Sequence, residues 1–326
     1  MSIDNRQDDL PQWSSFWRQG YITTFGSSKV NNYDGVVLQF WRDKFRELED
    51  GARVLDIATG NGAVATIAAE VSEEYEKRFS IAATDIAHIN SEIVGDSAAG
   101  RLRDGIDFRS STPCERQPFE DDSIELVTSQ FGFEYSDVPA TLKEIRRILV
   151  PGGQFIAISH HADSDLIKAA ASELEIYRFA LSELNLFAGV RDLFISYGDL
   201  NRSPETVARA MKSAKPLSTA INGAVNELLR RYPDEECARE IVDAVSHLAS
   251  GAKSVTQDER NRAVTAAAAD FAFANARLQD MVEAALTAEQ IENFSVEARE
   301  SGFRSAHCLK LYAGANSLSG WQIHLK

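Results

Sequence analysis

The chain has 326 residues, of which 44% are hydrophobic and 25% charged, as in an ordinary globular protein. Asp and Glu total 49 against 34 Lys and Arg, so the formal net charge is −15 and the phosphate backbone of a nucleic acid would be repelled. Composition therefore argues against global disorder and against a nucleic-acid partner.

The cysteines, the first residues and the apolar runs indicate the cellular compartment. Cys114, Cys237 and Cys308 are isolated in the sequence, so neither a disulfide framework nor a metal site is expected. The first residues are polar and acidic, whereas a secretory signal starts with basic residues and continues with an apolar run. No apolar run approaches the roughly 20 residues that a membrane-spanning helix needs. We expect a cytoplasmic protein with no metal and no membrane partner.

Residues 1–50 are expected to form an N-terminal helical or lid segment. Between residues 36 and 45, apolar side chains recur at roughly helical spacing, which predicts a helix that packs on the next domain. An aromatic cluster precedes this helix, from Trp13 to Phe25. Two interpretations of the cluster stay open: it packs against the main domain, or residues 21–28 form a lid over a ligand.

From Arg53 onward, apolar strands alternate with helical patterns, which is typical of a parallel sheet with crossover helices. The expected strands are 54–57, 81–85, 106–109, 124–129 and 155–159. The expected helices are 63–77, 90–103 and 138–149. Pro151, Gly152 and Gly153 then predict a helix stop and a turn that starts the next strand.

A glycine loop follows the first of these strands. The stretch VLDIATGNGAVA, residues 54–65, predicts a strand, a tight loop and the start of a helix. Gly60 and Gly62 let the backbone approach a ligand without interference from a Cβ, and the helix directs its free amide groups toward that ligand. With Ala65 they also match the dinucleotide spacing GxGxxG/A. The loop alone is compatible with a nicotinamide cofactor or with another nucleotide-like ligand.

Residues 163–286 show only helical periodicity and are too long for a connecting loop, so they predict an inserted helical cap. Apolar stripes lie at 167–179, 221–229 and 264–286. Prolines at 204, 216 and 233 are expected to separate the helices. An amphipathic helix at 288–302 and strands at 306–312 and 321–325 follow, and these strands predict a hairpin added to the edge of the sheet.

Five motifs occur in order along this framework. They are DIATGNG at 56–62, ATDIA at 83–87, PFEDDSIELVTSQFGFEYSD at 118–137, EIRRILVPGGQFIAISHH at 144–161, and ESGF at 300–303 before a hairpin that contains Trp321. Together they resemble the class I S-adenosylmethionine-dependent methyltransferases, over about residues 53–161 and 288–326. The N-terminal segment resembles that family weakly and the helical cap does not resemble it.

The resemblance implies an α/β fold with a doubly wound, mostly parallel seven-stranded sheet and an antiparallel C-terminal hairpin. Residues 51–162 and 287–326 would form this methyltransferase domain, interrupted by the helical insertion at 163–286. It also implies S-adenosyl-L-methionine as the cofactor. A nicotinamide cofactor would explain the glycines and Asp85 equally well, but it gives no reason for the terminal hairpin.

The family's motifs assign cofactor contacts to individual positions. Asp85 matches the acidic residue that takes both ribose hydroxyls, and a carboxylate suits a diol because it accepts two hydrogen bonds. Asp56 is expected to orient the amino acid end of the cofactor, and Ile86 to flank the adenine. The other expected cofactor contacts are Tyr21, Ala58, Gly60, Asn61, Gly62, Gln130 and Phe131.

Two positions depart from the family's pattern. Ala58 stands where the first glycine of the motif is more often found. The family commonly has an acidic residue in the loop after the third strand to receive the adenine amino group, whereas here that loop reads SSTPCER, residues 110–116. Ser111, Thr112 or a backbone carbonyl is expected to serve instead.

Methyl transfer is a displacement in which the protein mainly aligns the reactants and excludes water. The acceptor is expected outside the carboxyl ends of the strands. The candidate catalytic residues there are Glu134, Tyr135, His160 and His161. A histidine titrates near neutrality and suits a general base, yet either histidine also suits the cap of the next helix.

We therefore expect an S-adenosylmethionine-dependent methyltransferase that acts on a small molecule or a short peptide by direct in-line transfer, with the acceptor beneath the helical cap. Two other hypotheses stay open. One is an NAD(P)-dependent oxidoreductase. The other is a non-catalytic cofactor-binding or assembly subunit, whose alanine-rich cap helices form an interface such as that of a homodimer.

Overall fold

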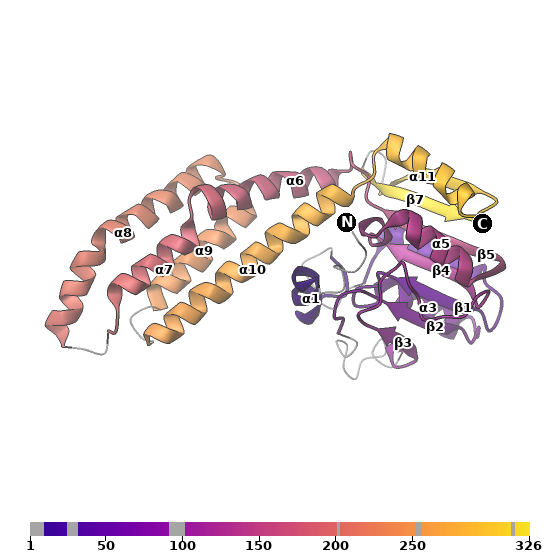
Figure 1. The fold of residues 1–326 in the computed structure, drawn as a ribbon, viewed down its shortest axis with the longest axis horizontal. Helices are drawn as coiled ribbons and strands as arrows, with labels where there is room; N and C mark the ends of the chain where they lie inside the picture. Colours follow the sequence, from indigo (N-terminus) through magenta and orange to yellow (C-terminus); the bar gives the residue numbers. More distant parts are fainter. Residues whose placement is uncertain (1–9, 25–31, 91–101, 201–202, 252–255, 314–316) are drawn as a thin grey trace. The chain divides into compact units, whose positions relative to one another are not determined.

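The computed structural model describes residues 10–24, 32–90, 102–200, 203–251, 256–313 and 317–326 (Figure 1). Most of the helix expected at 90–103, part of the stretch 21–28 and part of the turn before the last strand lie outside these residues. The chain divides into two compact units, one made of residues 1–168 with 280–326 and the other of residues 169–279.

The first unit is built on a seven-stranded sheet with the order β3-β2-β1-β4-β5-β7-β6 (Figure 1). Strands β1 to β5 pair in parallel, whereas β7 runs antiparallel to both β5 and β6. This order confirms the predicted fold class. The strands are β1 (Arg53–Ile57), β2 (Ser80–Thr84), β3 (Ile106–Arg109), β4 (Ile124–Gln130), β5 (Leu149–Ser159), β6 (Ala306–Tyr312) and β7 (Leu318–Leu325).

Side chains alternate along the strands, so each face of the sheet packs against its own pair of helices. Val54 and Leu126 belong to the core formed with α2 and α3, whereas Leu55 and Val127 belong to the core formed with α5 and α11. Trp41 of α2, from the helix expected at 36–45, is fully buried. The helices of this unit are α1 (Pro11–Arg18), α2 (Gly35–Arg46), α3 (Ala63–Glu74), η2 (Phe133–Tyr135), α5 (Val138–Ile148) and α11 (Ala288–Glu300).

Strand β5 contains a bulge in place of an expected turn. The residues Pro151, Gly152 and Gly153 do not separate a helix from a strand, because α5 ends at Ile148 and β5 begins at the next residue. The register with β4 shifts between the pairs Ile124↔Leu149 and Leu126↔Gln154. Proline has no N–H to donate to a ladder, so a strand accommodates it where the pairing is interrupted. The expected turn was therefore wrong.

The second unit is helical and has its own apolar core, which includes Phe194, Leu228 and Ile241. Pro216 lies inside α8 and does not separate two helices, so that expectation was wrong. Ala214 and Ile221 on either side of it are buried, and their packing holds the helix together. The helices are α6 (Asp165–Arg178, which begins in the first unit), α7 (Leu186–Tyr197), α8 (Pro204–Arg231), α9 (Glu236–Gly251) and α10 (Gln257–Ala284, which ends in the first unit), with a π-helical turn η3 at Phe179–Glu183. Within the described parts of the chain, none of the helices has the length and apolar character to cross a membrane.

The loops that follow β1 and β4 approach each other closely. Ala58 has a φ of +49°, in the left-handed region that glycine adopts most easily, so it keeps a glycine-like backbone without being glycine. A Cβ at Gly132 would lie 2.5 Å from the Cβ of Ala58 and 2.9 Å from its carbonyl oxygen. This approach leaves no room for a side chain at position 132.

The Gly132→Ala variant is expected to be less stable by about 1 to 3 kcal/mol, because its new methyl group overlaps Ala58. Adding Ala58→Gly should recover part of this loss, since it removes the atom that would be struck first. Urea unfolding followed by tryptophan fluorescence measures both differences.

Gly223→Ala in α8 is the matched control. No atom lies within 4 Å of its added Cβ, so it should raise stability by up to about 1 kcal/mol. A double variant no more stable than Gly132→Ala would show that the contact with Ala58 is not the constraint.

Candidate active site

A cavity of about 870 Å³ lies where the carboxyl ends of β1, β2 and β4 meet in the first unit. The loop after β3 and residues of the N-terminal segment complete its walls. Among the residues predicted for the site, those that line the cavity are Asp56, Ala58, Gly60, Asp85, Ile86, Ser111, Gln130, Phe131 and Tyr135. Those that do not line it are Tyr21, Asn61, Gly62, Thr112, Glu134, His160 and His161.

The glycine loop is packed closely against aromatic rings. Gly60 and Gly62 have φ values of +54° and +81°, which a residue with a side chain rarely adopts. A Cβ at Gly60 would lie 2.4 Å from the ring of Trp17, and one at Gly62 would lie 2.5 Å from the ring of Phe108. Neither position can therefore take a larger residue without displacing a ring.

Asp85 is held in place by two backbone amides. Its Oδ2 accepts a hydrogen bond from the N–H of Gly60 at 2.7 Å, and its Oδ1 accepts one from the N–H of Ala87 at 2.8 Å. Burial raises the pKa of Asp85 to about 6, although the two amides lower it. Each carboxylate oxygen keeps a second lone pair, so the group can still accept hydrogen bonds from a diol.

Asp56, in the neighbouring strand β1, is a second buried carboxylate. Its Oδ1 accepts a hydrogen bond from the hydroxyl of Thr128 at 2.8 Å, and its Oδ2 accepts one from the hydroxyl of Thr59. Burial, and to a smaller extent nearby Asp85, raise the pKa of Asp56 to about 7, although the two hydroxyls lower it. Two such carboxylates favour a ligand that brings positive charge or hydrogen-bond donors.

Glu134 and His160 are almost completely buried and lie outside the cavity lining. Oε1 of Glu134 accepts a hydrogen bond from the backbone N–H of His160 at 2.8 Å. Oε2 of Glu134 and Nδ1 of His160 have no hydrogen-bond partner among the described residues. Burial raises the pKa of Glu134 to about 7 and lowers that of His160 to about 3. The basicity of His160 is therefore low, and Glu134 suits proton transfer near neutral pH better.

His161 packs on Trp321, with the ring centroids 4.3 Å apart. Its Nδ1 accepts a hydrogen bond from the N–H of Asp163 at 2.9 Å, just before α6 begins. This arrangement agrees with the structural role at the start of a helix that the sequence left open. His161 lies outside the residues that line the cavity, so its role as a base stays a prediction.

Helix α1 supplies an aromatic wall that the motifs did not assign. Trp13 stacks on Trp17 at 6.3 Å and meets Tyr135 edge-on at 5.7 Å, and all three residues line the cavity. Nε1 of Trp13 donates a hydrogen bond to Asp280 at 2.9 Å, which fixes the indole ring. In the sequence, the aromatic cluster of the N-terminal segment indicated such a wall, but the sequence alone did not show which surface the cluster contacts.

Asn61 directs its side chain to the N-terminal segment and away from the cavity. Its Nδ2 donates hydrogen bonds to the carbonyls of Trp17 at 2.9 Å and Tyr21 at 2.7 Å, and its Oδ1 accepts one from the N–H of Asn90 at 2.8 Å. Tyr21 in turn stacks its ring on Phe16 at 5.1 Å. Asn61 and Tyr21 lie outside the residues that line the cavity, so their contact with a cofactor stays a prediction.

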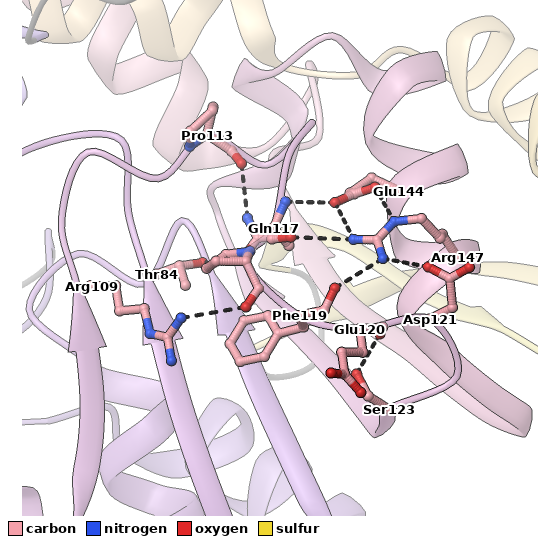
Figure 2. A network of polar contacts seen from close by, with 11 residues as sticks. Thr84, Arg109, Pro113, Gln117, Phe119, Glu120, Asp121, Ser123, Glu144 and Arg147 are labelled. Atoms are coloured by element: carbon pink, nitrogen blue, oxygen red, sulfur yellow. Dashed lines mark hydrogen bonds and ion pairs between the residues drawn. The ribbon is translucent and has the colours of Figure 1, made fainter.

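The loop after β3 is fixed by the polar network that Figure 2 shows. Oε1 of Gln117 accepts a hydrogen bond from the hydroxyl of Thr84 at 3.0 Å, and its Nε2 donates one to the carbonyl of Pro113 at 2.9 Å. Arg147 of α5 donates to the carbonyls of Gln117 at 3.2 Å and Phe119 at 2.9 Å. These bonds tie the loop both to the end of β2 and to α5.

The same loop brings Ser111 to the cavity but not Thr112. Thr112 donates its N–H to the carbonyl of Asp85 at 2.9 Å and its hydroxyl to the carbonyl of Ser110 at 3.1 Å, so it supports the backbone. Glu115 also lines the cavity, and its Oε1 accepts a hydrogen bond from the N–H of Asp137 at 2.7 Å. The loop therefore does present an acidic residue, which the sequence interpretation passed over.

Residues 36–181, just under half of the chain, match the ubiE/COQ5 methyltransferase family. The ubiquinone/menaquinone biosynthesis C-methyltransferase UbiE of Geobacter sulfurreducens is 31% identical over 160 residues, which cover 48% of this chain and 58% of that protein. UbiE of Rickettsia massiliae is 27% identical over 155 residues, which cover 43% and 61%. The chain thus spans less than two thirds of the length of the curated relatives it matches.

Two solved structures are also similar. A putative S-adenosyl-L-methionine-dependent methyltransferase from Methanococcus maripaludis is 17% identical, with a TM-score of 0.41 over 89% of this chain and 83% of that one. The YcgJ protein of Bacillus subtilis is 24% identical, with a TM-score of 0.33 over 43% and 58%. At such low TM-scores, neither structure supports a statement about the class or function of this protein.

The strand order, the glycine loop and the sequence matches together support one class of protein, the class I S-adenosylmethionine-dependent methyltransferases, as the motifs predicted. Within that class, the family it matches is the ubiE/COQ5 methyltransferases. The matched residues include β1 to β5 and the carboxylates Asp56 and Asp85. They do not include α1 or most of the helical unit.

Replacement of Glu134 by Gln should make the protein more stable at pH 8 than the wild type, by up to roughly 3 kcal/mol. The carboxyl of Glu134 has a pKa of about 7 when folded and an ordinary value of 4.5, so folding favours its protonated form. Its ionisation lowers wild-type stability as pH rises from about 4.5 through 7. Gln keeps an oxygen for the His160 N–H and cannot ionise.

Urea unfolding between pH 4 and pH 8 measures this difference, which should vanish at the acid end. The control is Glu227→Gln, because the pKa of that exposed carboxyl is lowered by its hydrogen bond to Arg230 and the sign of its pH dependence is opposite. Parallel stability profiles of Glu134→Gln and the wild type would refute the buried-carboxyl explanation.

Proposed function

We propose that this protein transfers a methyl group from S-adenosylmethionine to a small-molecule acceptor. The observation that carries the proposal is the cavity at the strand ends, where Asp85, Asp56 and the glycine loop come together. The oxidoreductase and assembly-subunit hypotheses have no support from the family match, which is to methyltransferases.

The residues around the cavity fit the chemical groups of this cofactor. Asp85 offers two carboxylate oxygens to the ribose diol, and its position is fixed by the amides of Gly60 and Ala87. Asp56 offers a carboxylate to the amino group of the methionine end. Positions 60 and 62 have no space for a Cβ, as expected for a loop that lies close to its neighbours and its ligand.

Bound S-adenosylmethionine supplies a methyl group activated by its sulfonium charge. The protein's own contribution is to hold the acceptor in line with that methyl group and to exclude water. Trp13, Trp17 and Tyr135 form an aromatic wall that can do both.

The acceptor that we favour is a small aromatic compound methylated at carbon. Two observations support this choice: aromatic side chains form part of the cavity lining, and the UbiE proteins that the chain resembles are named as C-methyltransferases. A short peptide remains the alternative acceptor. We further propose that residues 163–286 act as an insertion that folds around its own core, as a cover for the acceptor or as an interface.

The direct test is calorimetry with the purified protein. S-adenosylmethionine and S-adenosylhomocysteine should both bind, and labelled methyl groups should appear in the small-molecule fraction of a cell lysate incubated with the protein. Binding of NAD in place of both ligands would overturn the proposal, and label found in a peptide fraction would change the acceptor class.

Replacement of Asp85 by Asn should weaken binding of S-adenosylhomocysteine by about 1.5 to 3 kcal/mol, the range for hydrogen bonds lost from a charged group. The amide cannot accept from both ribose hydroxyls while it also bonds the amides of Gly60 and Ala87. Asp50→Asn, at an exposed ion pair with Arg78, is the control and should bind like the wild type. Equal affinity of Asp85→Asn and the wild type would remove Asp85 from the cofactor site.

A further inference from the structure

Gln130, the last residue of β4, lines the cavity and carries a buried amide group, one end of which is already bound. The residue as a whole is 9% exposed. Oε1 accepts a hydrogen bond from Nε1 of Trp41 at 2.7 Å, whereas Nε2 has no partner among the described residues. A buried N–H group without an acceptor lowers stability, so the unbound end calls for an explanation.

The orientation of this amide is determined by chemistry. The indole N–H of Trp41 can only donate, so the atom of Gln130 that faces it must be the oxygen. Rotating the amide by half a turn would place two donors against each other. The two N–H groups of Gln130 therefore lie on the side away from Trp41.

Trp41 is itself held rigidly. It is fully buried, its ring stacks on Phe45 at 6.0 Å, and the ring of Phe40 meets it at 5.0 Å with the planes 76° apart. It belongs to the core that α2 and α3 form against the sheet. A rigid donor behind Gln130 keeps the amide in one orientation, so the donors are positioned before any ligand arrives.

We propose that Gln130 donates a hydrogen bond from Nε2 to an oxygen, carrying negative charge, of a molecule bound in the cavity, and that Trp41 is the positioning residue for this donor. The proposal rests on the proposed methyltransferase function. The oxygen belongs either to the carboxylate of the methionine end of the cofactor or to a phenolate or enolate of the acceptor. Both are anionic oxygens, and a neutral amide donor in the cavity that Asp56 also lines suits either one.

The test compares the wild type with Gln130→Met, which removes the amide at similar length, and with Gln130→Glu, which places an acceptor where the donor was. Calorimetry measures S-adenosylhomocysteine and 5′-methylthioadenosine, which lacks the amino acid end. The rate of methyl transfer at saturating S-adenosylmethionine is measured with the small-molecule fraction of a cell lysate.

If the oxygen is the cofactor's, Gln130→Met should weaken S-adenosylhomocysteine about five- to twentyfold and leave 5′-methylthioadenosine unchanged. If it is the acceptor's, both affinities should persist and the rate at saturating cofactor should fall by about tenfold or more. Gln130→Glu should lower the affected quantity, affinity or rate, more than Gln130→Met does. Unchanged affinities and unchanged rates in both variants would overturn the proposal.

Trp41→Phe tests the positioning role. It should lower the affinity or the rate that Gln130→Met lowers, by about threefold. When added to Gln130→Met it should have no further effect, because the donor that Trp41 orients is then absent. The control is Trp321→Phe, which also loses a buried indole hydrogen bond, to the carbonyl of Leu286 at 2.8 Å, but lies outside the cavity lining. Additive losses in the double variant would refute the positioning role.

The two proposals fail in different ways. A wild-type protein that binds neither S-adenosylhomocysteine nor S-adenosylmethionine refutes the proposed function. A wild type that binds and transfers methyl groups, alongside Gln130 variants that behave like it, refutes only the role of Gln130.

Discussion

The parallel pairing of β1 with β2 and β4 is the constraint on which the cavity depends. Asp56 pairs with Ala83 on one side and with Thr128 on the other, so the residues that follow these strands meet at one edge of the sheet. Asp85 comes directly after β2 and Gln130 ends β4. A shift of one residue in either pairing would turn these side chains to the opposite faces and separate the groups that line the cavity.

The same pairing concentrates buried carboxylates. Asp56, Asp85 and Glu134 all have raised pKa values because they are removed from water, and no ion pair to any of them is found in the described parts of the chain. The hydroxyls and amides that bond to them offset only part of this cost. A ligand with a sulfonium and an ammonium group would bring positive charge to the cavity that Asp56 and Asp85 line, and would so favour the ionised form of both carboxyls.

Much of the fold could be predicted because its signals are local. The alternation of apolar strands and helices, the glycine loop and Asp85 are each visible within a few residues. The bulge at Pro151–Gly153 and the continuous helix around Pro216 could not be predicted, because pairing with β4 and burial of Ala214 and Ile221 override the local preference of proline. Packing between distant segments likewise decided which predicted site residues reach the cavity: Asn61 is drawn to the carbonyls of Trp17 and Tyr21, and the aromatic wall of α1 depends on Asp280.

The placement of β7 between β5 and β6 has a consequence for how the chain folds. β5 ends at Ser159 and its partner β7 begins at Leu318, with the whole helical unit between them in the sequence. During synthesis, β5 is therefore made long before β7, and the edge of β5 that pairs with β7 stays unpaired until then. A long connection adds little to the entropy cost of closure, but it delays the contact. The unpaired edge of β5 is therefore open to pairing with a wrong strand until β7 is made.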